Sequence, residues 1–228
     1  MTTQPRTPTV HARAKAAAPH ALLLAVALAC TLPALAQTPA HTDNAATATD
    51  AIDPRDRPTP RYLLQGPRGQ AIRSEDFHDR FQLVAFGYMS CPDVCPGTMQ
   101  EMKLILGSLG EQAKQLQPIF ISVDPDRDTP AVLHEYVRTF DDRILGLTGN
   151  ARLVRWAADN FKVEYKKVTE PGAAPGSYAM DHTAGMFLLG PDGQLLKKFG
   201  YSTPVANITE TIQQWIAADA RWRKDNRR

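Results

Sequence analysis

Two cysteines, Cys91 and Cys95, are the residues of this sequence with the clearest chemical potential. They stand in the segment Ala85 to Met99, AFGYMSCPDVCPGTM, where each is followed directly by a proline. Two neighbouring thiols can form a structural disulfide, serve as a redox pair or bind a soft metal ion. A disulfide here would close only a tiny loop, where its stabilising effect is smallest. A purely structural role is therefore disfavoured.

The spacing of the pair leaves metal binding and redox chemistry both open. Cys-Pro-Asp-Val-Cys is one residue longer than the Cys-x-x-Cys of dithiol oxidoreductases. The additional residue lets both sulfurs converge on one ion and still permits a disulfide. Pro96 suits the start of a helix, which places Cys95 at a helix N-terminus. The unpaired N–H groups and the helix dipole there favour the thiolate, which serves either chemistry.

A third candidate ligand, His182, comes from a distant part of the chain. It stands in DHTAGMFLLGPDG at the entry to a predicted hairpin, where thioredoxin-like reductases carry a cis-proline facing their cysteines. An imidazole directed at two thiolates makes a three-ligand site that suits Cu(I), or Cu(II) with an added oxygen ligand. Zinc binds the same ligand types. The sequence therefore favours a copper site made by Cys91, Cys95 and His182.

Two carboxylates are candidates for holding these ligands in place. Asp124 follows a predicted core strand in SVDPDRD, and Asp181 directly precedes His182. Residues around a metal site often orient its ligands by hydrogen bonds. A loop cap for Asp124 and a turn former for Asp181 are equally good interpretations.

Strands and helices alternate in the part of the chain that must position these side chains. The buried strands are expected at residues 82–88 and Pro118–Val123, with extended or hairpin segments at Gly66–Gly69, 144–148 and 183–199. The helices are expected at Pro96–Gly110, from Thr129 and Pro130, near Asn150–Asn160, and from Thr203 and Pro204. Val168–Met180 is expected to be a loop. This order predicts an α/β, thioredoxin-like fold: a mixed central sheet flanked by helices, preceded by a β-hairpin.

The first 36 residues have the three parts of a secretory signal peptide. Three basic residues precede the apolar run Ala21–Cys30, and the small-x-small pattern Ala34-Leu35-Ala36 follows it. We expect cleavage after Ala36 and export to the periplasm, where disulfides persist. The run falls short of the roughly 20 apolar residues that a spanning helix needs. An uncleaved membrane-associated segment and a lipidated Cys30 are the alternatives.

The remaining chain divides into a tether, a domain and a tail. Residues 37–60 are rich in Ala, Thr, Asp and Pro and predict a flexible tether, residues 61–220 the folded domain, and residues 221–228 a basic tail. The whole chain of 228 residues has a formal charge of +2, and loss of the three basic residues of the signal segment leaves about −1. A net charge this close to zero argues against a nucleic-acid partner.

Four ordered segments carry a resemblance to a known family. FGYMSCPDVCP, IFISVDPDRDTP, ILGLTG and DHTAGMFLLGPDG together resemble the Sco/SenC family of exported, copper-binding, thioredoxin-like proteins that serve cytochrome c oxidase assembly. The resemblance covers roughly Tyr62 to Ala218. It implies that the copper ligands are Cys91, Cys95 and His182.

Two functions from different classes follow. One is a metallochaperone, without turnover of its own, that delivers copper to the dinuclear copper centre of the oxidase subunit or to another copper acceptor. The other is a thiol–disulfide reductase that keeps the copper-ligand cysteines of that subunit reduced, with Cys91 and Cys95 as its redox-active disulfide pair. His182 in place of the cis-proline favours the first, and the helix-terminal dithiol favours the second. A membrane-proximal location accompanies both.

Overall fold

The computed structural model describes residues 57–169, 171–172, 174 and 176–226. The predicted signal peptide, the alternative lipidation site Cys30 and most of the predicted tether lie outside these residues. Among the described helices, none combines the length and the apolar character needed to cross a membrane.

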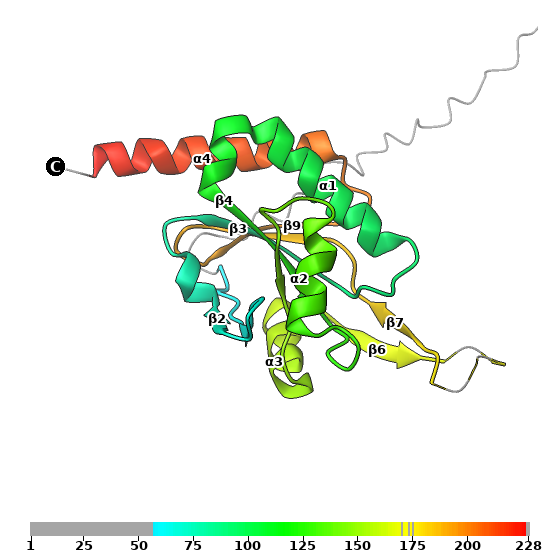
Figure 1. Cartoon of the computed structure of the whole chain (residues 1–228). Helices are drawn as coiled ribbons and strands as arrows, with labels where there is room; N and C mark the ends of the chain where they lie inside the picture. The colour runs from blue at the N-terminus through cyan, green and yellow to red at the C-terminus, as the bar shows by residue number, and fades with distance from the viewer. Residues whose placement is uncertain (1–56, 170, 173, 175, 227–228) are drawn as a thin grey trace, which may run out of the picture. The chain divides into compact units, whose positions relative to one another are not determined.

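The centre of the domain is a five-stranded mixed sheet with strand order β5-β4-β3-β8-β9 (Figure 1). Its strands are β3 (Phe81–Gly87), β4 (Leu116–Ser122), β5 (Leu145–Leu147), β8 (Met186–Leu189) and β9 (Leu195–Phe199). β3, β4 and β5 are parallel, whereas β8 is antiparallel to both β3 and β9. Every residue of β3 is buried, as its continuous apolar run predicts.

Two small antiparallel sheets accompany the central one. The first pairs β1 (Leu63–Gln65) with β2 (Ala71–Arg73), and the second pairs β6 (Tyr165–Val168) with β7 (Ala179–His182). The β1–β2 pair is the hairpin expected around Gly66–Gly69. The hairpin β6–β7 was not expected from the sequence, and it carries His182 at its end.

Four α-helices and two 3₁₀-helices complete the described part of the domain. They are η1 (Ser74–Phe77), α1 (Val94–Leu109), η2 (Gly110–Gln115), α2 (Pro130–Arg138), α3 (Ala151–Phe161) and α4 (Val205–Asp225). Helix α2 begins with Thr129 as N-cap and Pro130 as its first residue, as predicted. Helix α3 has Asn150 as its N-cap, whose side chain accepts a hydrogen bond from the backbone N–H of Leu153.

The helices cover both faces of the central sheet. Helices α1 and α4 lie side by side on one face (Figure 1). Phe161 of α3 packs edge-on against Phe86 and Phe187, whose ring centroids lie 5.3 Å from its own. Because successive side chains of a strand point to opposite faces, Phe86 and Gly87 belong to different sides of the sheet. Gly87 faces the N-terminus of α1, so α3 covers the other face.

The prediction of an α/β, thioredoxin-like fold with a mixed sheet flanked by helices is confirmed. Several boundaries differ by one or two residues from the predicted ones, and two differences concern the helices α1 and α4. Helix α1 begins at Val94, two residues before Pro96, because the first N–H groups of a helix lack intrahelical acceptors and proline is tolerated there. Helix α4 continues to Asp225, so the first residues of the predicted basic tail are helical.

Candidate metal centre

The two cysteines lie where β3 ends and α1 begins. Cys91 belongs to the connecting loop and is half-buried, whereas Cys95 is the second residue of α1 and only 1% exposed. The backbone N–H of Cys95 donates to the sulfur of Cys91 over 3.5 Å. Both thiols are free. The helix N-terminus therefore presents a backbone donor to Cys91, as expected for a thiolate site.

The two thiols differ in acidity. Burial alone would raise the pKa of Cys91, but hydrogen bonds from the backbone N–H groups of Asp93 and Cys95 outweigh it and lower that pKa below its ordinary value. For Cys95, burial dominates and raises the pKa far above its ordinary value. Cys91 is therefore the sulfur that ionises first.

Gly87, the last residue of β3, makes room for the buried sulfur. A Cβ atom added at Gly87 would lie 2.7 Å from Cys95 Sγ and 2.7 Å from Cε2 of Phe120. Real Cβ atoms essentially never approach other heavy atoms this closely. The absence of a side chain at Gly87 thus allows the strand to pass directly beside Cys95.

His182 approaches the cysteines from the end of β7. Its Nε2 lies 3.6 Å from Cys95 Sγ, and its Nδ1 lies 3.1 Å from the backbone oxygen of Thr183. A carbonyl oxygen can only accept, so Nδ1 donates this hydrogen bond, and Nε2 is the ring nitrogen that faces Cys95. The ring of Tyr88 meets the imidazole edge-on, with centroids 5.9 Å apart. The sequence-based expectation that His182 faces the cysteines agrees with this geometry.

Cys95 is the centre of this arrangement, since it contacts both other candidate ligands. Within the described part of the chain, however, no three His, Cys, Asp or Glu side chains stand together as a ready-made metal cage. The donors are two sulfurs and one imidazole nitrogen, a set that suits Cu(I) and that zinc also accepts. Binding by all three donors therefore requires these side chains to come closer together than they lie here.

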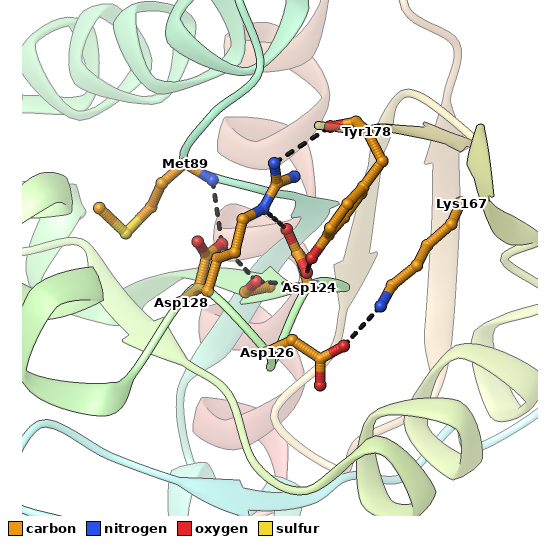
Figure 2. A network of polar contacts seen from close by, with 8 residues as sticks. Met89, Asp124, Asp126, Asp128, Lys167 and Tyr178 are labelled. Atoms are coloured by element: carbon orange, nitrogen blue, oxygen red, sulfur yellow. Dashed lines mark hydrogen bonds and ion pairs between the residues drawn. The ribbon is translucent and has the colours of Figure 1, made fainter. Parts of the chain in front are cut away.

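Asp124 belongs to a buried polar network beside the site (Figure 2). Its carboxylate is 0% exposed, accepts a 2.7 Å hydrogen bond from the hydroxyl of Tyr178, and forms an ion pair with Arg127. Arg127 Nη1 also donates to the backbone oxygen of Tyr178 over 3.0 Å. Asp124 and Arg127 thus clamp the segment that leads into β7 and His182. Asp124 stands in contact with the support of the site rather than with its candidate ligands.

The same turn holds the cysteine loop through Asp128. One oxygen of this buried carboxylate accepts hydrogen bonds from the backbone N–H of Met89 at 3.0 Å and from the hydroxyl of Ser122 at 2.6 Å (Figure 2). Burial raises the pKa of Asp128, although both hydrogen bonds oppose the shift. The turn after β4 therefore connects the cysteine loop to the hairpin that carries His182.

Asp181 is directed away from the thiols. Its side chain is exposed and lies 3.4 Å from Nζ of Lys166, its partner across the β6–β7 hairpin. Neighbouring residues of a strand point to opposite faces, so Asp181 and His182 cannot both face Cys95. The structure does not bring Asp181 to the candidate ligands.

Sequence reasoning missed three residues of this support: Arg127, Asp128 and Tyr178. Arg127 and Asp128 belong to SVDPDRDTP, the motif that drew attention to Asp124. The clustering of acidic and basic residues directly after a core strand was the available signal. Tyr178 follows a Gly/Ala/Pro-rich segment whose pattern predicts only a loop.

This fold and site define a class of protein: thioredoxin-like domains with a dithiol at a helix N-terminus and a histidine that faces it. The family model described as SCO1/SenC matches residues 50–217. The chain belongs to the SCO1/SenC family.

Individual relatives agree with this membership. The SCO2-like protein of Rickettsia felis is 34% identical over 152 residues, which are 67% of this chain and 74% of that protein. The mitochondrial SCO2 homologue of Mus musculus is 35% identical over 69% of this chain and 62% of its own length. The structure of Bradyrhizobium japonicum ScoI with copper bound is 32% identical, covers 69% of this chain and 99% of that one, and has a TM-score of 0.63.

Proposed function

We propose that this protein is a copper-binding metallochaperone whose ligands are Cys91, Cys95 and His182. The observation that carries the proposal is the 3.6 Å approach of His182 Nε2 to Cys95 Sγ, beside the hydrogen bond that the backbone N–H of Cys95 donates to Cys91 Sγ. Three soft or borderline donors suit Cu(I) and leave room for a recipient's ligand. Copper bound in a solved relative supports the same metal here.

The recipient that the family suggests is the copper-bearing subunit of cytochrome c oxidase. Export directed by the predicted signal peptide would place this delivery in the periplasm, close to the membrane. The copper ion is cargo in this function. The protein needs no turnover of its own, because binding and release are the whole task.

A thiol–disulfide reductase acting on the same oxidase subunit is the second candidate function. It is favoured by the acidity of the half-exposed Cys91, since a thiolate attacks disulfides and Cys95 can then resolve the mixed disulfide. In this function His182 would have no essential part.

The substitution His182→Ala separates the two functions. It removes the nitrogen donor and leaves both sulfurs, so we expect Cu(I) affinity to fall at least roughly tenfold and Cu(II) binding to weaken more. Competition with a chromophoric Cu(I) chelator measures the first, and titration of Cu(II) absorbance the second. Exchange with a small disulfide should persist. His78→Ala, at an exposed histidine outside the site, is the matched control.

The physiological measurement is oxidase assembly in a strain that produces each variant. Failure with His182→Ala despite intact disulfide exchange supports the metallochaperone. Assembly that persists with His182→Ala and fails with Cys91→Ser supports the reductase. Unchanged affinity for both copper oxidation states in His182→Ala would contradict the proposed ligand set.

A further inference from the structure

Helix α4 is longer than the part of it that packs into the core. Its buried residues end with Ile216, and no described residue of the helix beyond Ile216 is buried. The terminal segment of α4, residues 217–225, continues past the central sheet and α1 (Figure 1). Arg223 in this segment pairs with Asp219 at 2.7 Å and with Asp79, in the turn before β3, at 3.1 Å. These pairs hold the segment against the domain and leave its outer surface in solvent.

An apolar groove runs along this segment. It has a volume of about 640 Å³ and lies between α4 and the turn that joins β8 to β9. Trp215, Ala218 and Trp222 line it from the helix, and their spacing of three and four residues places them on one face of α4. Trp222 is 65% exposed, more than any other large apolar side chain of the described residues that is counted as exposed. An exposed aromatic ring beside an apolar groove indicates a contact surface.

The charges around the groove indicate what the contact surface meets. Residues 221–228 include five basic residues and one acidic residue. Arg221 and Lys224 lie close to Trp222 in the sequence and are exposed. A helix that combines a tryptophan on its apolar stripe with arginine and lysine beside it is typical of a segment that lies on a membrane surface. Tryptophan favours the headgroup level, and basic clusters are attracted to anionic lipids.

The groove lies at the opposite end of β3 from the dithiol. Phe81, the first residue of β3, lines the groove, whereas Gly87, the last, adjoins Cys95. The six residue steps between them span about 20 Å of extended strand. Arg57, the first described residue, also lines the groove, so the part of the sequence that contains the apolar run Ala21–Cys30 joins the domain here. A membrane at this end leaves the dithiol accessible at the other.

We propose that the terminal segment of α4 is a binding site for a membrane surface that contains anionic phospholipid. The ring of Trp222 enters the headgroup region, and Arg221 and Lys224 contact the lipid phosphates. The inference goes beyond copper delivery and does not depend on it, because none of the candidate metal ligands lines the groove.

The test is binding of the protein from Gln37 onward to vesicles of phosphatidylglycerol mixed with phosphatidylcholine. We expect binding that weakens as salt is added, because salt screens exposed charges, and little binding to vesicles of phosphatidylcholine alone. Trp222→Ala removes the inserted ring, so the partition coefficient, measured by sedimentation of the vesicles, should fall at least about fivefold. The vesicle-induced blue shift of tryptophan emission should disappear as well.

Trp156→Ala is the matched control for Trp222→Ala. Trp156 is 43% exposed and belongs to α3, which covers the other face of the sheet. Its replacement should change neither the partition coefficient nor the blue shift. Unchanged vesicle binding in Trp222→Ala would overturn the inference. Self-association that requires Trp222 and occurs without vesicle binding would also overturn it, since the groove would then hold a second copy of the chain.

Arg221→Gln tests the contribution of charge. We expect vesicle binding to weaken about fivefold, as for the loss of one basic residue near an anionic surface. Arg152→Gln removes the same charge from an exposed arginine of α3 and should leave binding unchanged. Equal losses in the two arginine variants would show attraction by net charge alone and would overturn the inference. Copper affinity should be unchanged in all four variants, so failure of the inference leaves the proposed function standing.

Discussion

Cys91 and Cys95 differ in exposure as well as in acidity, although they are neighbours at one helix end. Cys91 is half-buried, and its sulfur accepts a hydrogen bond from the backbone N–H of Cys95. Cys95 itself is enclosed between α1, Gly87 and His182. The outer sulfur is therefore the one that meets other molecules first. Cys95, the inner residue of the pair, contacts both Cys91 and the imidazole of His182.

The first prediction concerns alkylation of the reduced, metal-free protein. Iodoacetamide reacts with thiolates, and the pKa of Cys91 is lowered while that of Cys95 is raised. We expect Cys95 to react more slowly by a factor of roughly ten or more, since each unit of pKa changes the thiolate fraction about tenfold. Peptide mapping by mass spectrometry after short exposure measures both rates. Equal labelling of the two cysteines would contradict the described asymmetry.

The second prediction concerns the space at Gly87. Gly87→Ala forces a methyl group against Cys95 Sγ and the ring of Phe120, so we expect a loss of about 1–3 kcal/mol in the free energy of unfolding. Urea denaturation of the reduced protein measures it.

Gly107→Ala is the matched control for Gly87→Ala. Gly107 lies within α1, and a Cβ added there meets nothing within 4 Å. Alanine should stabilise the helix by roughly 0.5–1 kcal/mol. If the two substitutions had the same effect, the contact between Gly87 and Cys95 would not matter for stability.

At the scale of elements, the site depends on one turn between β4 and α2. Asp128 holds the cysteine loop through the N–H of Met89, and Asp124 with Arg127 holds the segment before β7 through Tyr178. The guanidinium carbon of Arg127 also lies 3.9 Å from the centroid of the Tyr178 ring. Among the described strands, β6 and β7 pair only with each other, so this clamp is a main connection of His182 to the cysteines.

The third prediction tests this clamp. Arg127→Ala leaves the fully buried carboxylate of Asp124 without its ion-pair partner, which typically costs about 3–5 kcal/mol. Because Arg127 is 30% exposed, solvent moderates the effect, and we expect roughly 2–3 kcal/mol by urea denaturation. Copper affinity should fall as well, since His182 is no longer held in place.

Arg138→Ala is the control for the clamp. Arg138 pairs with Glu135 and Asp142, both of which are largely exposed. Surface pairs contribute about 0–1 kcal/mol, so this variant should resemble the wild type in stability and copper affinity. An equal loss in the two arginine variants would refute the clamp.

At the scale of the whole molecule, the pattern of apolar residues and the positions of turn residues were sufficient to predict most of the fold. The apolar runs of β3 and β4 and the Thr129–Pro130 start of α2 were read correctly, because they follow from burial and capping. The hairpin β6–β7 was missed. Its residues Lys166 and Lys167 are exposed, so no buried face imposes an apolar pattern on the strand.

The candidate site was accessible to sequence reasoning only in part. The types and spacing of Cys91, Cys95 and His182 pointed to their chemistry, and their mutual approach follows from the predicted fold. The contacts of Arg127 with Tyr178 join residues 51 positions apart and depend on tertiary packing, which no local pattern encodes.

The fourth prediction concerns the mature chain. Cleavage after Ala36 gives an exported protein that starts at Gln37, as the Ala34-Leu35-Ala36 pattern indicates. Intact-mass measurement of protein recovered from the periplasm and from membranes checks it. A species that retains Met1, or one that carries a lipid on Cys30, would contradict the prediction and establish one of the two anchored alternatives.

Because the β6–β7 hairpin is separate from the five-stranded sheet, the two should open at different rates. A two-stranded hairpin is only marginally stable alone, so β6–β7 should open more often than the five-stranded sheet, and its amide protons should exchange with solvent sooner. His182 travels with the hairpin, whereas the two sulfurs stay at the junction of β3 and α1. In the proposed metallochaperone, each opening would therefore withdraw the nitrogen from the copper ion and keep both sulfurs. An incoming ligand from the recipient can take the vacated position before the ion meets bulk water.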